Sequence, residues 1–220
     1  MVSKIRVMAG LLALTSIPAA HAIAQEATVS TDETQAVEVL SQAEAQLIDE
    51  ATDFIRGLTS DATAAMTKEG ASEAERLAAF QVVLADGLAV EQIGKFMLGE
   101  ARKTITPAQL ERYNTIFPDY ITRLYAQQFK GIVNKPLEVI DAKKFRRNDT
   151  IVRTKLERAE GAPILVDWRV RRLKTDDHKI INISVNDVSI MLVKREEFSA
   201  FIAANGVDAL LDRLEEQAKA

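Results

Sequence analysis

Cysteine is absent from the 220 residues, and histidine occurs only twice, at His21 and His178. Without cysteine the chain can form no disulfide and offers no thiol nucleophile. With so little histidine, Ser-His-Asp triads, His-rich zinc sites and most general acid–base schemes are excluded. G-x-S-x-G, a phosphate-cradling glycine loop and H-E-x-x-H are missing as well. These absences predict a binding protein, not an enzyme, with no cofactor and no metal.

A hydrophobic run long enough to cross a bilayer is also missing. The longest candidate, Val7–Pro18, is too short, follows two basic residues and precedes small residues at two possible cleavage sites, after Ala22 or after Ala24. This pattern predicts a secretory signal peptide over residues 1–24. We therefore expect an exported, periplasmic protein that does not span a membrane, with a flexible polar tail over residues 25–35 and a single domain over residues 36–220.

Charge is unevenly distributed along a chain whose formal net charge is −4. Residues 25–91 hold fourteen acidic side chains against three basic ones, whereas residues 143–174 hold eleven basic side chains against four acidic ones. We expect no nucleic-acid partner for an exported protein. The basic half therefore favours an anionic lipid or an acidic protein as partner, or else it forms the solvent face of strands.

Apolar residues recur at helical spacing through the first half of the chain. One long helix is expected from Val37 to Leu58, with a break or an end near Gly57. Capping boxes predict further helix starts at Ser72 and at Thr106, where Pro107 suits the first helical position. A short helix is expected between these two, and Pro118 predicts a bend or restart in the last of the four.

The apolar period changes to two after Lys135. Four strands are expected in "PLEVIDAKKF", "TIVRTKLER", "PILVDWRVRRL" and "HKIINISV", and two helices follow, separated by Asn205-Gly206. In the last strand Ile181, Ile183 and Val185 should share one face. Helices, an antiparallel meander and helices again predict an α+β fold in which helices cover the apolar face of a four-stranded sheet.

Residues 113–129 hold all three tyrosines, and their apolar arc is wider than a surface helix normally buries. Tyr113, Phe117, Tyr120 and Leu124 share one stripe of it. Ordinary core packing explains such an arc. The wall of an apolar cavity explains it too, because a tyrosine combines an apolar ring with a polar hydroxyl and so suits the boundary between an apolar pocket and its solvent-exposed opening. Periodicity leaves both interpretations open.

The segment "FMLGEARKTITPAQLERYNTIFPDYITRLYAQQF" resembles the signature of the MlaC (toluene-tolerance) family of periplasmic phospholipid-binding proteins. The resemblance extends to "VDWRVRR", "VSIMLVKREEF" and "GVDALLDRL". Its matching positions are Leu98-Gly99, Arg102, Thr106-Pro107, Gln109, Phe117, Tyr125-Ala126, Val188-Ser189, Arg195 and Phe198.

Membership of that family implies a cystatin/NTF2-like α+β fold that encloses an apolar cavity for lipid tails. It implies a carrier that shuttles phospholipid between an outer-membrane MlaA-type lipoprotein complex and an inner-membrane MCE-domain (MlaD-type) ABC transporter, which maintains outer-membrane lipid asymmetry. Because each methylene exposed to water costs about 0.8 kcal/mol, an acyl chain needs such an escort across an aqueous gap.

Two sets of candidate residues follow from face and spacing within this interpretation. The expected wall of the acyl-chain cavity is Phe96, Met97, Phe117, Tyr120, Leu124, Val166, Trp168, Ile181 and Ile183. The expected contacts to a partner or a headgroup are Arg102, Arg169, Arg171 and Arg195. Three alternatives stay open: a carrier of another hydrophobic lipid such as a hopanoid, an NTF2-like small-molecule enzyme, and a periplasmic adaptor with a filled core.

Overall fold

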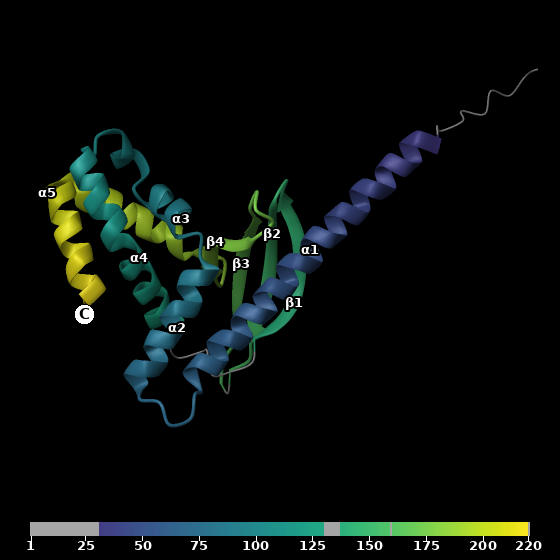
Figure 1. The fold of residues 1–220 in the computed structure, drawn as a ribbon, viewed down its shortest axis with the longest axis horizontal. Helices are drawn as coiled ribbons and strands as arrows, with labels where there is room; N and C mark the ends of the chain where they lie inside the picture. The colour runs from purple at the N-terminus through teal and green to yellow at the C-terminus, as the bar shows by residue number, and fades with distance from the viewer. Residues whose placement is uncertain (1–30, 130–136, 159, 220) are drawn as a thin grey trace, which may run out of the picture.

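The computed structural model describes residues 31–129, 137–158 and 160–219 (Figure 1). The predicted signal peptide, residues 1–24, lies outside the described residues, as does the predicted tail up to residue 30. The structure begins with helix α1 at Thr31, so the last residues of the expected tail are helical. No helix among the described residues is long and apolar enough to cross a membrane.

Helix α1, Thr31–Met66, runs straight through Gly57, where a break or an end was expected. Its apolar face is buried from Leu47 onward, through Ala51, Ile55 and Ala62. Packing of this face outweighs the roughly 1 kcal/mol that glycine costs inside a helix. The part before Leu47 projects beyond the sheet, and Leu40 there is 69% exposed (Figure 1).

Three further helices and a 3-10 turn complete the N-terminal half: α2 (Glu73–Gly87), α3 (Val90–Met97), η1 (Gly99–Lys103) and α4 (Pro107–Phe129). Both predicted capping boxes are confirmed. The Ser72 backbone N–H donates to the Glu75 carboxylate at 2.7 Å, and the Thr106 backbone N–H donates to the Gln109 side-chain oxygen at 3.0 Å. Of the bend or restart predicted at Pro118, the restart is absent, since α4 continues as one helix through this residue.

The sheet is an antiparallel meander in the order β1-β2-β3-β4-β5. Its strands are β1 (Glu138–Arg146), β2 (Asp149–Leu156), β3 (Ile164–Arg172), β4 (His178–Val185) and β5 (Val188–Ser189). The four expected strands are confirmed, and the two-residue β5 is an addition. It forms because Asn186 and Asp187 both take positive φ, 47° and 65°, which is the conformation of a tight hairpin turn.

The core lies between the inner face of the sheet and the helices. Helix α1 packs on β1, β2 and β3, while α2 and α3 pack on β4 (Figure 1). The last helix, α5 (Ile190–Lys219), packs on α4 and is kinked at Gly206, whose φ is 84°. The predicted separation of two helices at Asn205-Gly206 is confirmed, because the non-helical Gly206 divides α5 into two helical halves. The fold is α+β, with helices on one face of an antiparallel sheet.

Candidate functional site

An apolar pocket lies between the α1–α2 pair and the sheet. Its volume is about 30 Å³. The helical wall comprises Leu58, Thr59, Ala62 and Thr63 of α1 with Phe80 and Leu84 of α2. Phe129 at the end of α4, Leu137 before β1 and Trp168 of β3 complete the lining. Two consecutive helices, the end of α4 and the third strand of the sheet therefore converge on one apolar space.

Two threonines can line this pocket because their hydroxyls are already bonded. Thr59 donates to the Ile55 carbonyl and Thr63 to the Thr59 carbonyl, each at 2.8 Å. A hydroxyl that donates to its own helix backbone needs no further partner in an apolar space. The pocket wall therefore presents no polar group in need of a hydrogen bond from a ligand.

Aromatic rings form the opposite wall. The Phe129 ring stacks on Trp168 with centroids 5.7 Å apart, and Tyr125 stacks on Phe129 at 6.2 Å. The Trp168 indole N–H donates to the Thr154 hydroxyl at 2.9 Å, which satisfies its single polar atom. The Tyr125 hydroxyl is buried and has no hydrogen-bond partner among the described residues. Burial raises its pKa well above the usual range of a phenol, so it stays protonated.

The nine predicted wall residues separate into groups. Six are buried in the core, and Leu124 is partly buried against it. Trp168 alone among the nine lines the apolar pocket. The other buried members belong to the packed core: Met97, Phe117, Tyr120, Val166 and Ile183. Phe96 is 38% exposed and lies apart from this layer.

Ile181 lies on the opposite face of the sheet from Ile183, against expectation. A β-bulge interrupts the pairing of β3 with β4 between Arg169 and Val170. As a result both Ile180 and Ile183 face the core, each 0% exposed, and Ile181 turns outward. The strict alternation predicted for this strand is wrong because a bulge adds one unpaired residue and reverses the side-chain phase after it.

Phe96 and Ile181 both line a second space, which we call the outer cleft, on the outer face of the sheet. Its volume is about 430 Å³, and it lies between β3, β4, α3 and the start of α5. The remaining lining residues are Gln92, Arg169, Arg171, Asn182, Ser189, Met191 and Leu192. The lining of this cleft is more polar than that of the apolar pocket, and the cleft is more open to solvent, so it suits a polar ligand group or a partner side chain.

Two of the four predicted contact arginines share one buried carboxylate beside the outer cleft. Asp149, 1% exposed, accepts from Arg171 Nε at 2.6 Å and from Arg169 Nε at 2.9 Å. Burial alone would raise the pKa of Asp149, but the hydrogen bonds from Arg171 and Arg169 outweigh it and lower that pKa. The Arg169 guanidinium also lies 4.6 Å from the centroid of the exposed Phe145 ring.

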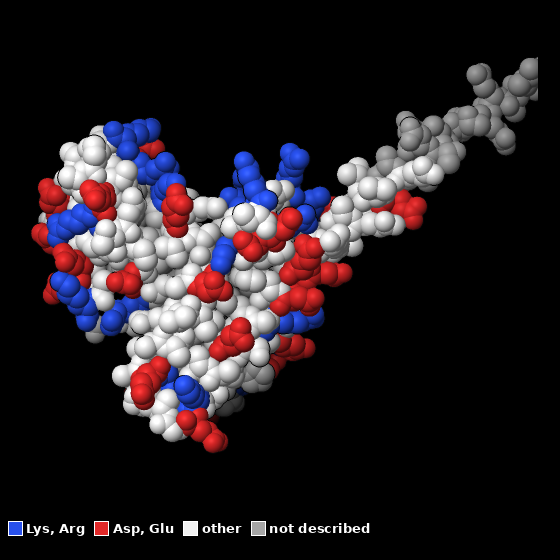
Figure 2. Space-filling model, in the orientation of Figure 1, with Lys and Arg blue, Asp and Glu red and all other residues white. Residues whose placement is uncertain are grey.

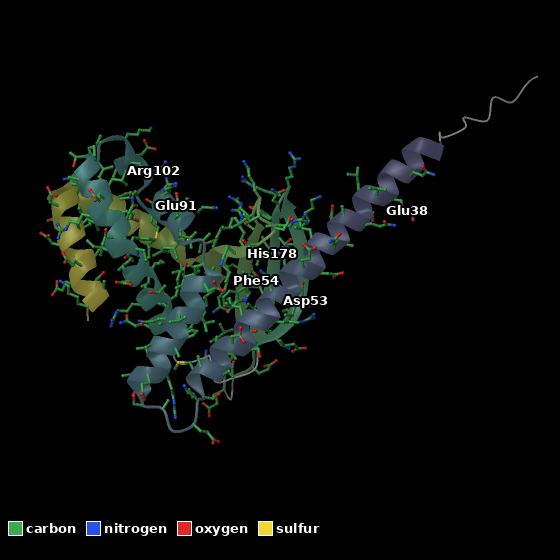
Figure 3. The ribbon with its side chains drawn as sticks, viewed as in Figure 1. Glu38, Asp53, Phe54, Glu91, Arg102 and His178 are labelled. Atoms are coloured by element: carbon green, nitrogen blue, oxygen red, sulfur yellow. The ribbon has the colours of Figure 1, made fainter. Side chains whose placement is uncertain are left out.

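The other two predicted arginines lie elsewhere. The Arg195 guanidinium is 4.8 Å from the centroid of the Phe96 ring, and its Nε would be 3.1 Å from a β-carbon placed on Gly99. Gly99 has φ 52°, so both its backbone and the adjacent guanidinium favour the absence of a side chain. Arg102 is exposed on η1, at the end of the helical lobe away from the sheet (Figure 3).

Sequence reasoning missed most of the pocket lining. Leu58 was expected at the end of the first long helix, and Phe80 and Leu84 follow the helix start predicted at Ser72, but none of the three was expected to line a pocket. Thr59 and Thr63 lie beyond the expected end of the first helix. No local signal distinguishes a pocket-lining leucine from a core leucine. Among the described residues, no group of three or more His, Cys, Asp or Glu side chains is placed to hold a metal ion.

Comparisons with known proteins give consistent results. A family model described as "MlaC protein" matches residues 55–216. The "Intermembrane phospholipid transport system binding protein MlaC" of Haemophilus influenzae is 24% identical over 132 residues, which are 59% of this chain and 62% of that protein. This chain therefore aligns with less than two thirds of the length of that curated relative.

A solved structure from Ralstonia solanacearum, described as a phospholipid-binding protein in complex with a phospholipid, superposes with a TM-score of 0.64. It covers 77% of this chain and 97% of the other, at 17% sequence identity. At that identity the likeness establishes a shared fold.

Proposed function

The chain belongs to the MlaC family, and we propose from this that it is a periplasmic phospholipid carrier which holds acyl chains between its α1–α2 pair and its sheet. The observation that carries the proposal is the apolar pocket at Trp168. Its lining is apolar except for two threonines, whose hydroxyls already donate to carbonyls of their own helix. Such a lining suits an acyl chain, since burial of each methylene is worth about 0.8 kcal/mol and no polar group competes.

Acyl-chain binding requires the pocket to widen. A volume of about 30 Å³ is far below the roughly 300–1,000 Å³ of ordinary ligand pockets. In our proposal the α1–α2 pair separates from the sheet. The acyl chain of the lipid then extends from Trp168 along the side chains of Val166, Ile183 and Leu124. Met97, Phe117 and Tyr120 belong to the same buried core. Phe96 and Ile181 line the outer cleft on the other face of the sheet and are no part of this path.

The proposed path of the lipid runs between an outer-membrane MlaA-type lipoprotein complex and an inner-membrane MCE-domain (MlaD-type) ABC transporter. The Haemophilus relative is named for an intermembrane phospholipid transport system, which supports this role. Uptake and release need only a difference in lipid affinity between carrier and partner, with no covalent step. Arg102, Arg169, Arg171 and Arg195 are the proposed contacts to a partner or headgroup.

Filling the pocket tests the proposal. Ala62→Leu should reduce the fraction of protein that carries lipid severalfold, because Ala62 is 8% exposed and lines the pocket. Ala64→Leu is the matched control, since Ala64 is exposed two residues away on the same helix. Native mass spectrometry gives the loaded fraction, and solvent extraction identifies the lipid.

Each result of this experiment has a defined consequence. Phospholipid bound to the wild type and to Ala64→Leu, with loss in Ala62→Leu, supports the carrier and its pocket. A terpenoid mass in place of phospholipid would assign the pocket to another hydrophobic lipid. Protein that carries no lipid and takes up none when phospholipid is added would overturn the proposal and leave a filled core.

A further inference from the structure

A concave basic surface, the tip cleft, lies at the far end of the sheet from the apolar pocket. It is formed by the β1–β2 turn, the end of β3 and Gln92 of α3, and its volume is about 480 Å³. Figure 2 shows Lys and Arg side chains gathered at these strand ends, beside a notch that separates them from α3. Its basic lining residues are Arg146, Arg147, Arg171, Arg172 and Lys174.

The tip cleft is a site of its own. Leu137 lines the apolar pocket, whereas Arg146 ends the strand that follows, nine residues later. At about 3.3 Å per residue the two positions are roughly 30 Å apart. On β3 the two sites come closer, because Trp168 and Arg171 are only three residues, roughly 10 Å, apart. There they are separated by the sheet itself: Trp168 is buried on its inner face, whereas Arg171 faces the outer cleft and bonds to Asp149. The basic residues of the tip cleft therefore lie outside the lining of the apolar pocket.

Three of the five cations have no ion-pair partner among the described residues. Arg171 bonds to Asp149, and Arg172 bonds to Asp176 at 3.1 Å and Glu50 at 3.4 Å. Asp149 is the single acid in the lining, and Arg169 and Arg171 already occupy both of its oxygens. Arg146, Arg147 and Lys174 are therefore unpaired at ion-pair distance among the described residues. The acids that line the adjoining space with Arg147 and Lys174 are Glu44 and Asp176.

The backbone under these cations is held in place. The Arg172 N–H donates to the Asn148 carbonyl at 2.9 Å, which ties the β1–β2 turn to the end of β3. In the turn after β3, the Leu173 N–H donates to the Asp177 carbonyl at 2.8 Å, and the Asp176 N–H donates to the Leu173 carbonyl at 3.1 Å. Asp149 fixes the Arg171 side chain at the base. Like charges gathered on a rigid frame repel one another, and an anion between them relieves that repulsion.

The free donors match a phosphate group. Each of the Arg146 and Arg147 guanidiniums carries five N–H donors in a planar fork that pairs well with phosphate oxygens, and Lys174 adds a point charge. The volume exceeds that of a bare phosphate and falls in the range of small-molecule sites. We propose that the tip cleft binds a phosphate-bearing anion, either the headgroup of an anionic lipid in a bilayer or a soluble organic phosphate.

Neutralisation of two exposed cations tests the site. Arg147→Gln with Lys174→Gln removes charge from the tip cleft, and Lys68→Gln with Arg158→Gln is the matched control, because both of those side chains are exposed and outside the cleft lining. The probes are glycerol 1-phosphate in calorimetry and vesicles of phosphatidylglycerol or phosphatidylcholine in flotation, all at equal ionic strength. We expect at least tenfold weaker binding in the tip pair and less than a twofold change in the control pair, with unchanged urea unfolding in both.

The two probes distinguish the source of the phosphate. Binding to phosphatidylglycerol vesicles without binding to glycerol 1-phosphate assigns the cleft to a bilayer surface, and binding to glycerol 1-phosphate assigns it to a soluble ligand. The proposal is overturned if the wild type binds neither probe. It is also overturned if the tip-cleft double variant and the control double variant lose the same amount of probe affinity. Lipid carried through purification is measured separately by extraction, so failure here leaves the carrier function standing and the reverse also holds.

Discussion

At the scale of single residues, His178 places a buried ring nitrogen at the start of β4, without a hydrogen bond in the described part of the chain. It begins β4, where α1 crosses the sheet, with its ring centroid 6.1 Å from that of Phe54 (Figure 3). Its Nε2 is buried without a hydrogen bond among the described residues and lies 3.6 Å from a Glu50 oxygen. Burial lowers the pKa of His178, and the attraction of Glu50 only partly opposes this. The imidazole is therefore neutral at pH 7.

A pH-dependent loss of stability follows from His178. The unfolded chain binds its proton near pH 6.5, whereas the folded chain resists protonation. The free energy of unfolding should hold above pH 6.5 and fall as the pH drops from there through the lower folded pKa. In the His178→Gln variant the free energy of unfolding should change less over this pH range, as measured by urea unfolding at pH 7.5, 6 and 5.

A second decrease in the free energy of unfolding, at more acidic pH, provides an internal control. Asp149 has a lowered pKa, so its contribution is present above its ordinary value of 3.8 and is lost as the pH falls through its folded pKa. His178→Gln should leave that decrease unchanged. An equally steep loss between pH 7.5 and 5 in wild type and variant would show that His178 does not cause it.

At the scale of elements, α3 and α4 approach closely at Gly94. A β-carbon at Gly94 would lie 3.0 Å from the Phe117 ring, and the Tyr113 hydroxyl donates to the Gly94 carbonyl at 3.0 Å. The Phe117 ring is itself confined between Tyr113 and Tyr120, with centroids 5.0 and 6.0 Å away. A side chain at this position has no room unless the helices separate.

Two identical substitutions measure that contact. Gly94→Leu should destabilise the fold by about 2 kcal/mol, because overpacking of a closed interface costs about 1–3 kcal/mol. Gly57→Leu should stabilise it by about 0.5–1 kcal/mol, since Gly57 is helical, exposed and has open space at its β-carbon. Urea unfolding gives both values, and equal effects at the two positions would contradict the close α3–α4 packing.

The elements differ in how much of their structure the sequence predicts. Capping at Ser72 and Thr106 was predictable because its hydrogen bonds span only three residues. The bulge that turns Ile181 outward was not, because it depends on the register of β4 against β3. The passage of α1 through Gly57 was also missed, since burial of the whole helix face outweighs one unfavourable residue.

The candidate site was harder to predict for the same reason. Trp168 was identified from strand alternation, which is a local pattern. The pocket that it lines exists only where α1, α2 and the end of α4 meet β3, so its other residues are defined by tertiary packing. Burial of Asp149 beneath two arginines likewise depends on the pairing of β2 with β3.

At the scale of the whole molecule, the two parts of α1 have different surroundings. From Leu47 onward it forms one wall of the core, whereas the residues before it extend past the sheet (Figure 1). Glu44 of the extension forms an exposed ion pair with Lys144 at 2.9 Å, and Leu40 and Ala43 border an open space beside the β1–β2 turn. Exposed pairs of this kind contribute about 0–1 kcal/mol. The extension should therefore be separable from the stability of the domain.

Stepwise shortening of α1 tests this division. Relative to a chain that begins at Thr31, one that begins at Gln42 should unfold at nearly the same urea concentration, because the described side chains that it loses, Leu40 among them, are exposed. A chain that begins at Asp49 also loses Leu47, which is 7% exposed, and should be less stable by about 1.5–3 kcal/mol. The two chains differ by seven residues, so a large loss already at Gln42 would mean that the projecting turns pack on the domain in solution.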